Sequence, residues 1–149
     1  MKGELTGGCL CGAVRYTLRE GMRLNAYACH CTDCQSRTGS AFSEHMLFAL
    51  ADFAITGELD VGEYDYPSGG HARIYGCAKC KARIYATNDA REGMASLRCG
   101  TLDSSASFVP AGHVWAKSKQ PWIGLPEGAK VMDEQPRTTE EWVAFVGLA

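Results

Sequence analysis

Hydrophobic and polar residues alternate along several short segments of the chain, a pattern typical of half-buried β-strands. Within residues 13–19, Val14, Tyr16 and Leu18 fall on one face. Further strands are predicted at residues 72–75, 82–85, 94–97 and 112–116. Turn-forming residues interrupt the pattern at residues 57–58, 67–70 and 88–89. The pattern predicts a mainly β protein.

Helical patterning is confined to two short segments. One helix is expected after Cys34, through residues 35–37, and Gly39 would end it. The other is a short C-terminal helix, because Thr138 begins a capping box ahead of the apolar residues 142–146. Residues 124–136, with two prolines and two glycines, are predicted to be a surface loop. Without internal repeats, residues 1–149 are predicted to form a single domain.

Composition narrows the class of protein. Hydrophobic residues make up 46% of the chain and charged residues 21%, as in ordinary globular proteins. The formal charge of −2 argues against nucleic acid or an anionic membrane surface as a partner. The longest apolar run, residues 46–51, is far too short to span a bilayer, and the N-terminal residues do not resemble a secretory signal. We therefore expect a cytoplasmic protein.

Eight cysteines in such a chain are better explained as reduced thiols that hold metal than as disulfides. Their spacings are C-x-C, C-x-C-x-x-C and C-x-x-C, with one cysteine alone. Two pairs complete a four-thiolate structural zinc site, and the remaining triplet would hold a second ion. The structural set is Cys9, Cys11, Cys77 and Cys80; the second set is Cys29, Cys31 and Cys34.

Other groupings are possible. A zinc ribbon could pair the cysteines of residues 31–34 with those of residues 77–80, but the spacer between them is unusually long and three cysteines would be left over. A thioredoxin-like redox role for the second pair requires a βαβ context, whereas strands are predicted on both sides. An iron–sulfur cluster is chemically compatible with any four thiolates. We favour zinc.

The triplet lacks a fourth ligand in its own segment. Cys99 is the remaining thiol, although in a strand it could equally be a small buried apolar residue. His30 lies between two ligands and should point away from them, since residues i and i+2 share a face. His45 and His113 could reach the site only through the fold, and His71 is expected at the surface. The fourth coordination position is therefore either filled by one of these residues or open to a substrate.

An open zinc with three thiolates would favour sulfur chemistry. Its net charge near −1 makes it a weaker activator of water than a zinc held by neutral ligands. A substrate thiol can enter as a fourth thiolate and remain nucleophilic. Such a sulfur could attack a small carbonyl, or the adduct could be cleaved in reverse. Arg37 and Arg98 are the candidate cations for this site, unless they are ordinary surface arginines.

Several motifs resemble the glutathione-dependent formaldehyde-activating enzyme family, which also includes centromere protein V. The motifs are GCLCGAVRY at residues 8–16, CHCTDCQSRTGS at 29–40, GCAKC at 76–80, GTLD at 100–103, and HVW at 113–115 with Trp122. The resemblance extends from about residue 5 to residue 125. It implies an Mss4-like (β-tent) architecture of small sheets organised around zinc. It also implies the same division of the cysteines, with the triplet holding a catalytic zinc.

By this resemblance the protein would form and cleave carbon–sulfur bonds as a lyase, on a small glutathione-like thiol adduct of formaldehyde. Thr38, Gly39 and Ser40, just after the triplet, are candidates for lining the substrate pocket, whereas Trp115 and Trp122 are expected to be packing residues. The main alternative is a non-catalytic binding module with two structural zincs. A metal-sensing or thiol-storage protein with a labile second zinc is a further possibility.

Overall fold

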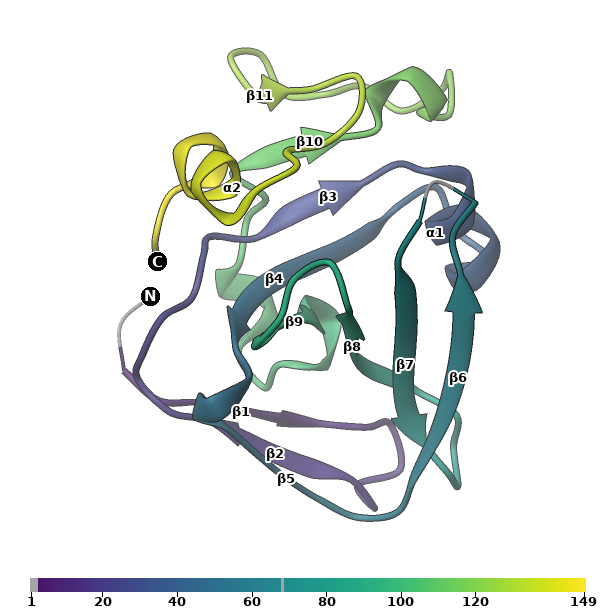
Figure 1. Ribbon diagram of the computed structural model, residues 1–149, viewed down its shortest axis with the longest axis vertical. Helices are drawn as coiled ribbons and strands as arrows, with labels where there is room; N and C mark the ends of the chain where they lie inside the picture. Colours follow the sequence, from purple (N-terminus) through teal and green to yellow (C-terminus); the bar gives the residue numbers. More distant parts are fainter. Residues whose placement is uncertain (1–2, 68) are drawn as a thin grey trace.

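The computed structural model describes residues 3–67 and 69–149, and these ranges contain two sheets and two α-helices (Figure 1). Three strands form an antiparallel sheet in the order β1 (Leu5–Gly8), β2 (Arg15–Leu18) and β5 (Phe53–Thr56). The larger sheet has the order β11-β10-β3-β4-β9-β8-β7-β6. Its strands are β3 (Tyr27–Cys29), β4 (Ser43–Ala49), β6 (Leu59–Asp65), β7 (His71–Cys77), β8 (Arg83–Asn88), β9 (Met94–Arg98), β10 (Gly112–Val114) and β11 (Lys130–Val131). The prediction of a mainly β protein is confirmed.

Both predicted helices are present. Helix α1 (Thr32–Thr38) begins earlier than expected because Cys31 is its N-cap, so Cys34 lies within the helix. Helix α2 (Thr139–Val146) starts at the predicted cap, where the Glu141 N–H donates to Thr138 Oγ1 at 3.1 Å. Short 3₁₀ turns occur at η1 (Leu50–Asp52), η2 (Cys99–Thr101), η3 (Ser105–Ser107) and η4 (Ala116–Ser118). Neither α-helix in the described ranges has the length and apolar character needed to cross a membrane.

Each predicted strand corresponds to an observed one, namely β2, β7, β8, β9 or β10. The sequence pattern did not identify β1, β3, β4, β5 or β6. Strand β4 is buried on both faces and therefore lacks alternation, while β3 has only three residues. The prediction of a loop over residues 124–136 was wrong at β11, because its two residues pair in parallel with β10.

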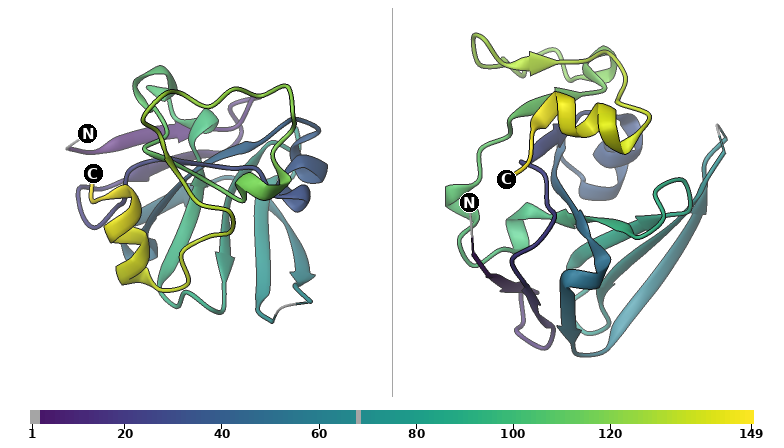
Figure 2. Two further views of the ribbon diagram at one scale, coloured as in Figure 1. Left: turned by 90° about the horizontal axis from the view of Figure 1, so that it is seen from above. Right: turned by 60° about the vertical axis from the view of Figure 1, so that its left-hand side comes forward.

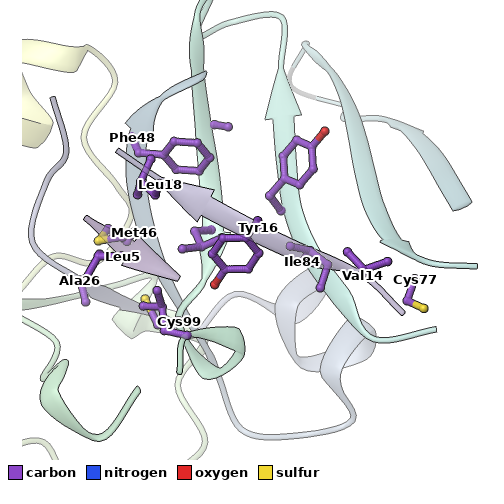
Figure 3. Packing of buried hydrophobic residues seen from close by; sticks show 14 residues of the cluster. Leu5, Val14, Tyr16, Leu18, Ala26, Met46, Phe48, Cys77, Ile84 and Cys99 are labelled. Atoms are coloured by element: carbon purple, nitrogen blue, oxygen red, sulfur yellow. The ribbon is translucent and has the colours of Figure 1, made fainter. Parts of the chain in front are cut away.

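Strand β4 contributes side chains to both hydrophobic cores. Met46 and Phe48 pack in the first core, between the small sheet and β7 to β9 (Figure 3). Leu47 points the other way, into a second core. There Trp142 of α2 packs on the Tyr27 ring, with centroids 4.4 Å apart. Helix α2 thus covers the side of the large sheet that holds β3 and β10 (Figure 2).

Candidate metal centres

Four cysteines from two distant hairpins converge at the junction of the two sheets. Cys9 and Cys11 lie in the turn between β1 and β2, and Cys77 and Cys80 lie in the turn between β7 and β8. The four Sγ atoms are all within 4.8 Å of one another. We call this group the four-cysteine site. The C-x-x-C turn between β7 and β8 therefore meets the C-x-C turn of the first hairpin.

The sulfur geometry of the four-cysteine site fits a tetrahedral ion. The Sγ atoms of Cys9 and Cys11 are 3.6 Å apart, and those of Cys11 and Cys77 are 3.8 Å apart. A tetrahedral zinc with Zn–S bonds of about 2.3 Å requires sulfur separations of about 3.8 Å. The backbone N–H groups of Lys79 and Cys80 both point to Cys77 Sγ at 3.4 Å, as expected for a supported thiolate. These residues fit zinc.

The second cluster lies at the start of α1. Cys29 ends β3, Cys31 is the N-cap of α1, and Cys34 is in its first turn. Their three Sγ atoms lie within 4.8 Å of one another, and no fourth cysteine, histidine or carboxylate of the described residues joins them. We call this group the triplet site. Tertiary structure thus keeps the two predicted sets of cysteines separate.

The triplet site favours the binding of a cation. Hydrogen bonds from the Cys29 and Cys34 thiols lower the pKa of Cys31 to about 3, and backbone N–H groups of α1 support the same thiolate. The interactions with Cys31 and Cys34, together with burial, raise the pKa of Cys29 far above its usual range. The Cys31 thiolate therefore forms easily, but the loss of a second proton from the cluster is strongly opposed. A divalent ion would remove that opposition, so the donor set fits zinc.

Most of the candidate fourth ligands lie elsewhere. Cys99 is fully buried in the first core, where burial raises the pKa of its thiol (Figure 3). His30 points away from the triplet, as predicted, and pairs through Nε2 with Nδ1 of His113 at 3.0 Å. His71 is part of a surface cluster with Glu63 and Asp65.

His45 is the histidine that contacts the triplet. Its Nε2 lies 3.9 Å from Cys34 Sγ, and its Nδ1 lies 3.1 Å from the Arg98 guanidinium. Because arginine only donates, Nδ1 must accept, and the ring proton resides on Nε2, facing the sulfur. Burial, and next the charge of Arg98, hold the pKa of His45 well below its usual range, so the imidazole is neutral. Sequence spacing does not reveal this contact, since strand pairing creates it.

The predicted cations are close to the site. Burial lowers the pKa of Arg98, and negative charge on the Cys34 sulfur would oppose that lowering. The Arg37 guanidinium donates to the Tyr66 hydroxyl at 3.0 Å and lies over the Tyr64 ring. Neither arginine has a carboxylate partner among the described residues.

Residues 38–40 form the C-terminal cap of α1. Gly39 adopts the left-handed conformation with φ of 63°, and Thr38 Oγ1 donates to the Cys34 carbonyl at 2.8 Å. A role for Thr38, Gly39 and Ser40 in substrate binding stays a prediction. Trp115 packs against the second core as expected, whereas the expectation for Trp122 was wrong, because its side chain in an exposed turn is 74% accessible.

Comparison with known proteins agrees with these observations. The family model of the glutathione-dependent formaldehyde-activating enzyme matches residues 4–118. A Rhodobacter sphaeroides protein, solved as a structural-genomics target, is similar in fold with a TM-score of 0.50 and 18% sequence identity. The alignment covers 70% of this chain and 97% of that one. None of the curated proteins compared with the chain matches it.

Proposed function

Because the chain belongs to the glutathione-dependent formaldehyde-activating enzyme family, we propose that it is a zinc-dependent carbon–sulfur lyase acting on a thiol–aldehyde adduct such as S-hydroxymethylglutathione. The triplet site would hold the catalytic zinc, and the four-cysteine site a structural one. The observation that carries the proposal is the triplet itself: three converging sulfurs, with no fourth cysteine, histidine or carboxylate atom of the described residues within 4.8 Å of all three. A three-ligand zinc is the arrangement of catalytic sites.

The proposed reaction requires only that the substrate is bound and that a thiophilic metal is present. Cleavage breaks the C–S bond, leaves its electron pair on sulfur, and moves the hydroxyl proton of the adduct to the released thiol. No oxidant or reductant is consumed. Zinc in the triplet site would supply a Lewis acid that binds the substrate sulfur as a thiolate.

The protein contributes the orientation of that site. His45 holds a proton on Nε2 and directs it to Cys34 Sγ, while Arg98 fixes the tautomer from the opposite side. Such partners of metal ligands set ligand orientation and basicity. Cys29 is buried, so that side of the cluster is closed to water, whereas Cys31 and Cys34 are only half-buried. A substrate would therefore approach from the side of α1.

The position of His45 also favours a second function, a non-catalytic binding module with two structural zincs. A modest movement could bring Nε2 from 3.9 Å of Cys34 to the metal and close the site. That closure would require the proton to leave Nε2 and Arg98 to give up its acceptor. The lyase is compatible with the tautomer inferred from the Arg98 contact without rearrangement, and we prefer it.

The test is to measure bound zinc and to screen thiol–aldehyde adducts with the wild-type protein. We expect two zincs per chain and turnover of at least one adduct. Cys31→Ser should lose one zinc and the activity, while Cys99→Ser, which removes a thiol outside both sites, should keep both. If two zincs are bound and no adduct is turned over, the lyase assignment is wrong and the binding module is favoured.

A further inference from the structure

A groove of about 400 Å³ lies on one face of the sheet formed by β6, β7 and β8. Its floor is formed by Gly62 and Gly76, which lie on neighbouring strands. Arg83 of β8 and Arg37 of α1 also line it. The volume falls within the range of small-molecule sites, about 300–1,000 Å³. The groove can hold a ligand the size of a short peptide.

The glycine at position 62 leaves space that a side chain would occupy. Its φ is not positive, so the backbone does not require glycine there. A Cβ at this position would have a single neighbour, the Ile74 carbonyl oxygen at 4.0 Å, and would project into open volume. Glycine in a strand interior costs stability and often marks the close approach of a ligand. The groove is therefore built into the strand sequence.

The unpaired charges of the groove are both positive. Arg83 makes no hydrogen bond or ion pair within the described ranges, and its Nη1 atom is buried. Arg37 donates a hydrogen bond to the Tyr66 hydroxyl and lies over the Tyr64 ring, and it has no carboxylate partner within the described ranges. The two carboxylates of the groove are already neutralised, since Asp60 pairs with Lys81, and Glu63 pairs with a histidine and an arginine on the edge of the hairpin. A buried guanidinium nitrogen without an acceptor is costly, so an anionic ligand is expected here.

The groove adjoins the triplet site. Arg37 and Cys34 lie three residues apart on α1, and side chains at this spacing share one side of a helix. Burial and then Arg37 lower the pKa of Arg83, while negative charge on the Cys34 sulfur would raise it, so these groups are within electrostatic reach of one another. A ligand whose sulfur enters the triplet site would have the groove beside it.

We propose that this groove is the carboxylate subsite of the enzyme, in which Arg83 and Arg37 bind a carboxylate of a peptide-like thiol whose sulfur enters the triplet site. The binding of the ligand's sulfur rests on the proposed function, whereas the binding of its carboxylate rests on the groove. It selects acidic thiols over neutral ones. Arg83 is the main determinant of specificity, because it has no other partner, and Gly62 provides the room.

Calorimetric titration of the zinc-loaded protein tests the subsite with three probes: glutathione, its S-methyl thioether, and neutral 2-mercaptoethanol. Arg83→Gln removes the charge, and Gly62→Val adds volume at the floor, where its Cβ would meet no atom closer than 4.0 Å. Arg137→Gln is the control, because it removes an exposed arginine that pairs with Glu134 and does not line the groove. We expect Arg83→Gln and Gly62→Val to weaken glutathione binding about ten- to hundredfold, the range for a charge-assisted hydrogen bond, and Arg137→Gln to leave it within about twofold.

The same titrations separate the two hypotheses. The subsite predicts that the thioether also depends on Arg83 and that 2-mercaptoethanol does not. If glutathione binds both groove variants as tightly as the wild type, or if Arg137→Gln loses as much affinity, the subsite is wrong. If the thioether binds as tightly as glutathione and 2-mercaptoethanol does not bind, the subsite stands. In that case the thiol chemistry of the proposed function fails.

Discussion

At the scale of single residues, Cys99 is a thiol whose surroundings exclude it from metal binding. It packs in the first core with no exposed surface, and burial raises the pKa of its thiol. We expect Cys99→Ala to keep both zincs and to lower the free energy of unfolding by about 1 kcal/mol, the cost of a small cavity. Zinc analysis and urea unfolding measure the two quantities. Loss of a zinc would show that Cys99 is a ligand.

His45 is the residue through which the fold acts on the triplet site. Removing its N–H donor in His45→Leu should reduce zinc affinity at that site about 10- to 100-fold, as for other partners of metal ligands. A competition titration against a chelator measures this, with His71→Leu, a histidine bonded to Glu63 and Asp65 and outside both cysteine clusters, as the control. His45→Gln, which can still donate to Cys34, should recover part of the affinity. Equal affinity in His45→Leu and wild type would contradict the role.

At the scale of elements, α2 is held to the sheet by one large side chain. Trp142 is buried against Tyr27, and β10 approaches the helix so closely that a Cβ at Gly112 would lie 2.6 Å from the Phe145 ring. We expect Trp142→Ala to cost about 3–5 kcal/mol of unfolding free energy. Glu140→Ala, an exposed change on the same helix, should cost less than about 0.5 kcal/mol. Similar urea midpoints for the two variants would mean that α2 is not docked as described.

The small sheet is joined to the segment after β9 by Asp103, which pairs with Arg15 and accepts a hydrogen bond from Thr6. The Arg15 guanidinium, helped by Thr6, lowers the pKa of Asp103 to about 2. A carboxyl whose pKa is lowered in the folded state stabilises it above the unfolded pKa, near 4, and loses this contribution as the pH falls through about 2.

Asp103→Asn should therefore be less stable than the wild type at neutral pH, and the two should converge as the pH falls from about 4 to 2. The effect should be small and weaker in salt, because both partners are about half exposed. Unfolding of both proteins across this range in equal zinc measures the difference, and acid release of zinc affects both alike. A difference that persists at the lowest pH would contradict this assignment.

At the scale of the whole molecule, the two cysteine sites have different expected roles. The four-cysteine site joins the small sheet to β7 and β8, so its zinc should contribute to folding, whereas the triplet site lies at the end of one helix. Cys77→Ser should cost about 3 kcal/mol or more, since it also buries an unmatched hydroxyl. Cys31→Ser should leave the protein folded. Thermal unfolding compares them, and equal stability would contradict the division of roles.

Both cores share β4, and we propose that residues 1–149 unfold as a single domain. The sequence predicted the mainly β class, both helices and five strands. It missed β4 because a strand buried on both faces shows no alternation, and β11 because two residues carry no period. It also grouped the seven clustered cysteines, but it did not identify His45 or Arg83 as neighbours of the triplet.

Two identical tetrapeptides show why the sequence alone does not reveal the position of a residue such as Arg83. Residues 72–75 and 82–85 both read ARIY, yet Arg73 is an exposed partner of Glu63 while Arg83 faces the groove. A register shift at Tyr75 and Gly76 turns the start of β8 so that Arg83 lies opposite Gly76. One extra residue in a strand moves a side chain to the other face.

The sequence by itself determined which cysteines lie together within each motif, because C-x-C and C-x-x-C spacings bring thiols together through covalent geometry over a few residues. It also determined the dominance of strands, through local alternation. Only the tertiary structure decided that Cys99 belongs to the core, that His45 faces Cys34, and that Arg83 is left without a partner. These contacts depend on strand register between segments far apart in the chain, which no local pattern specifies.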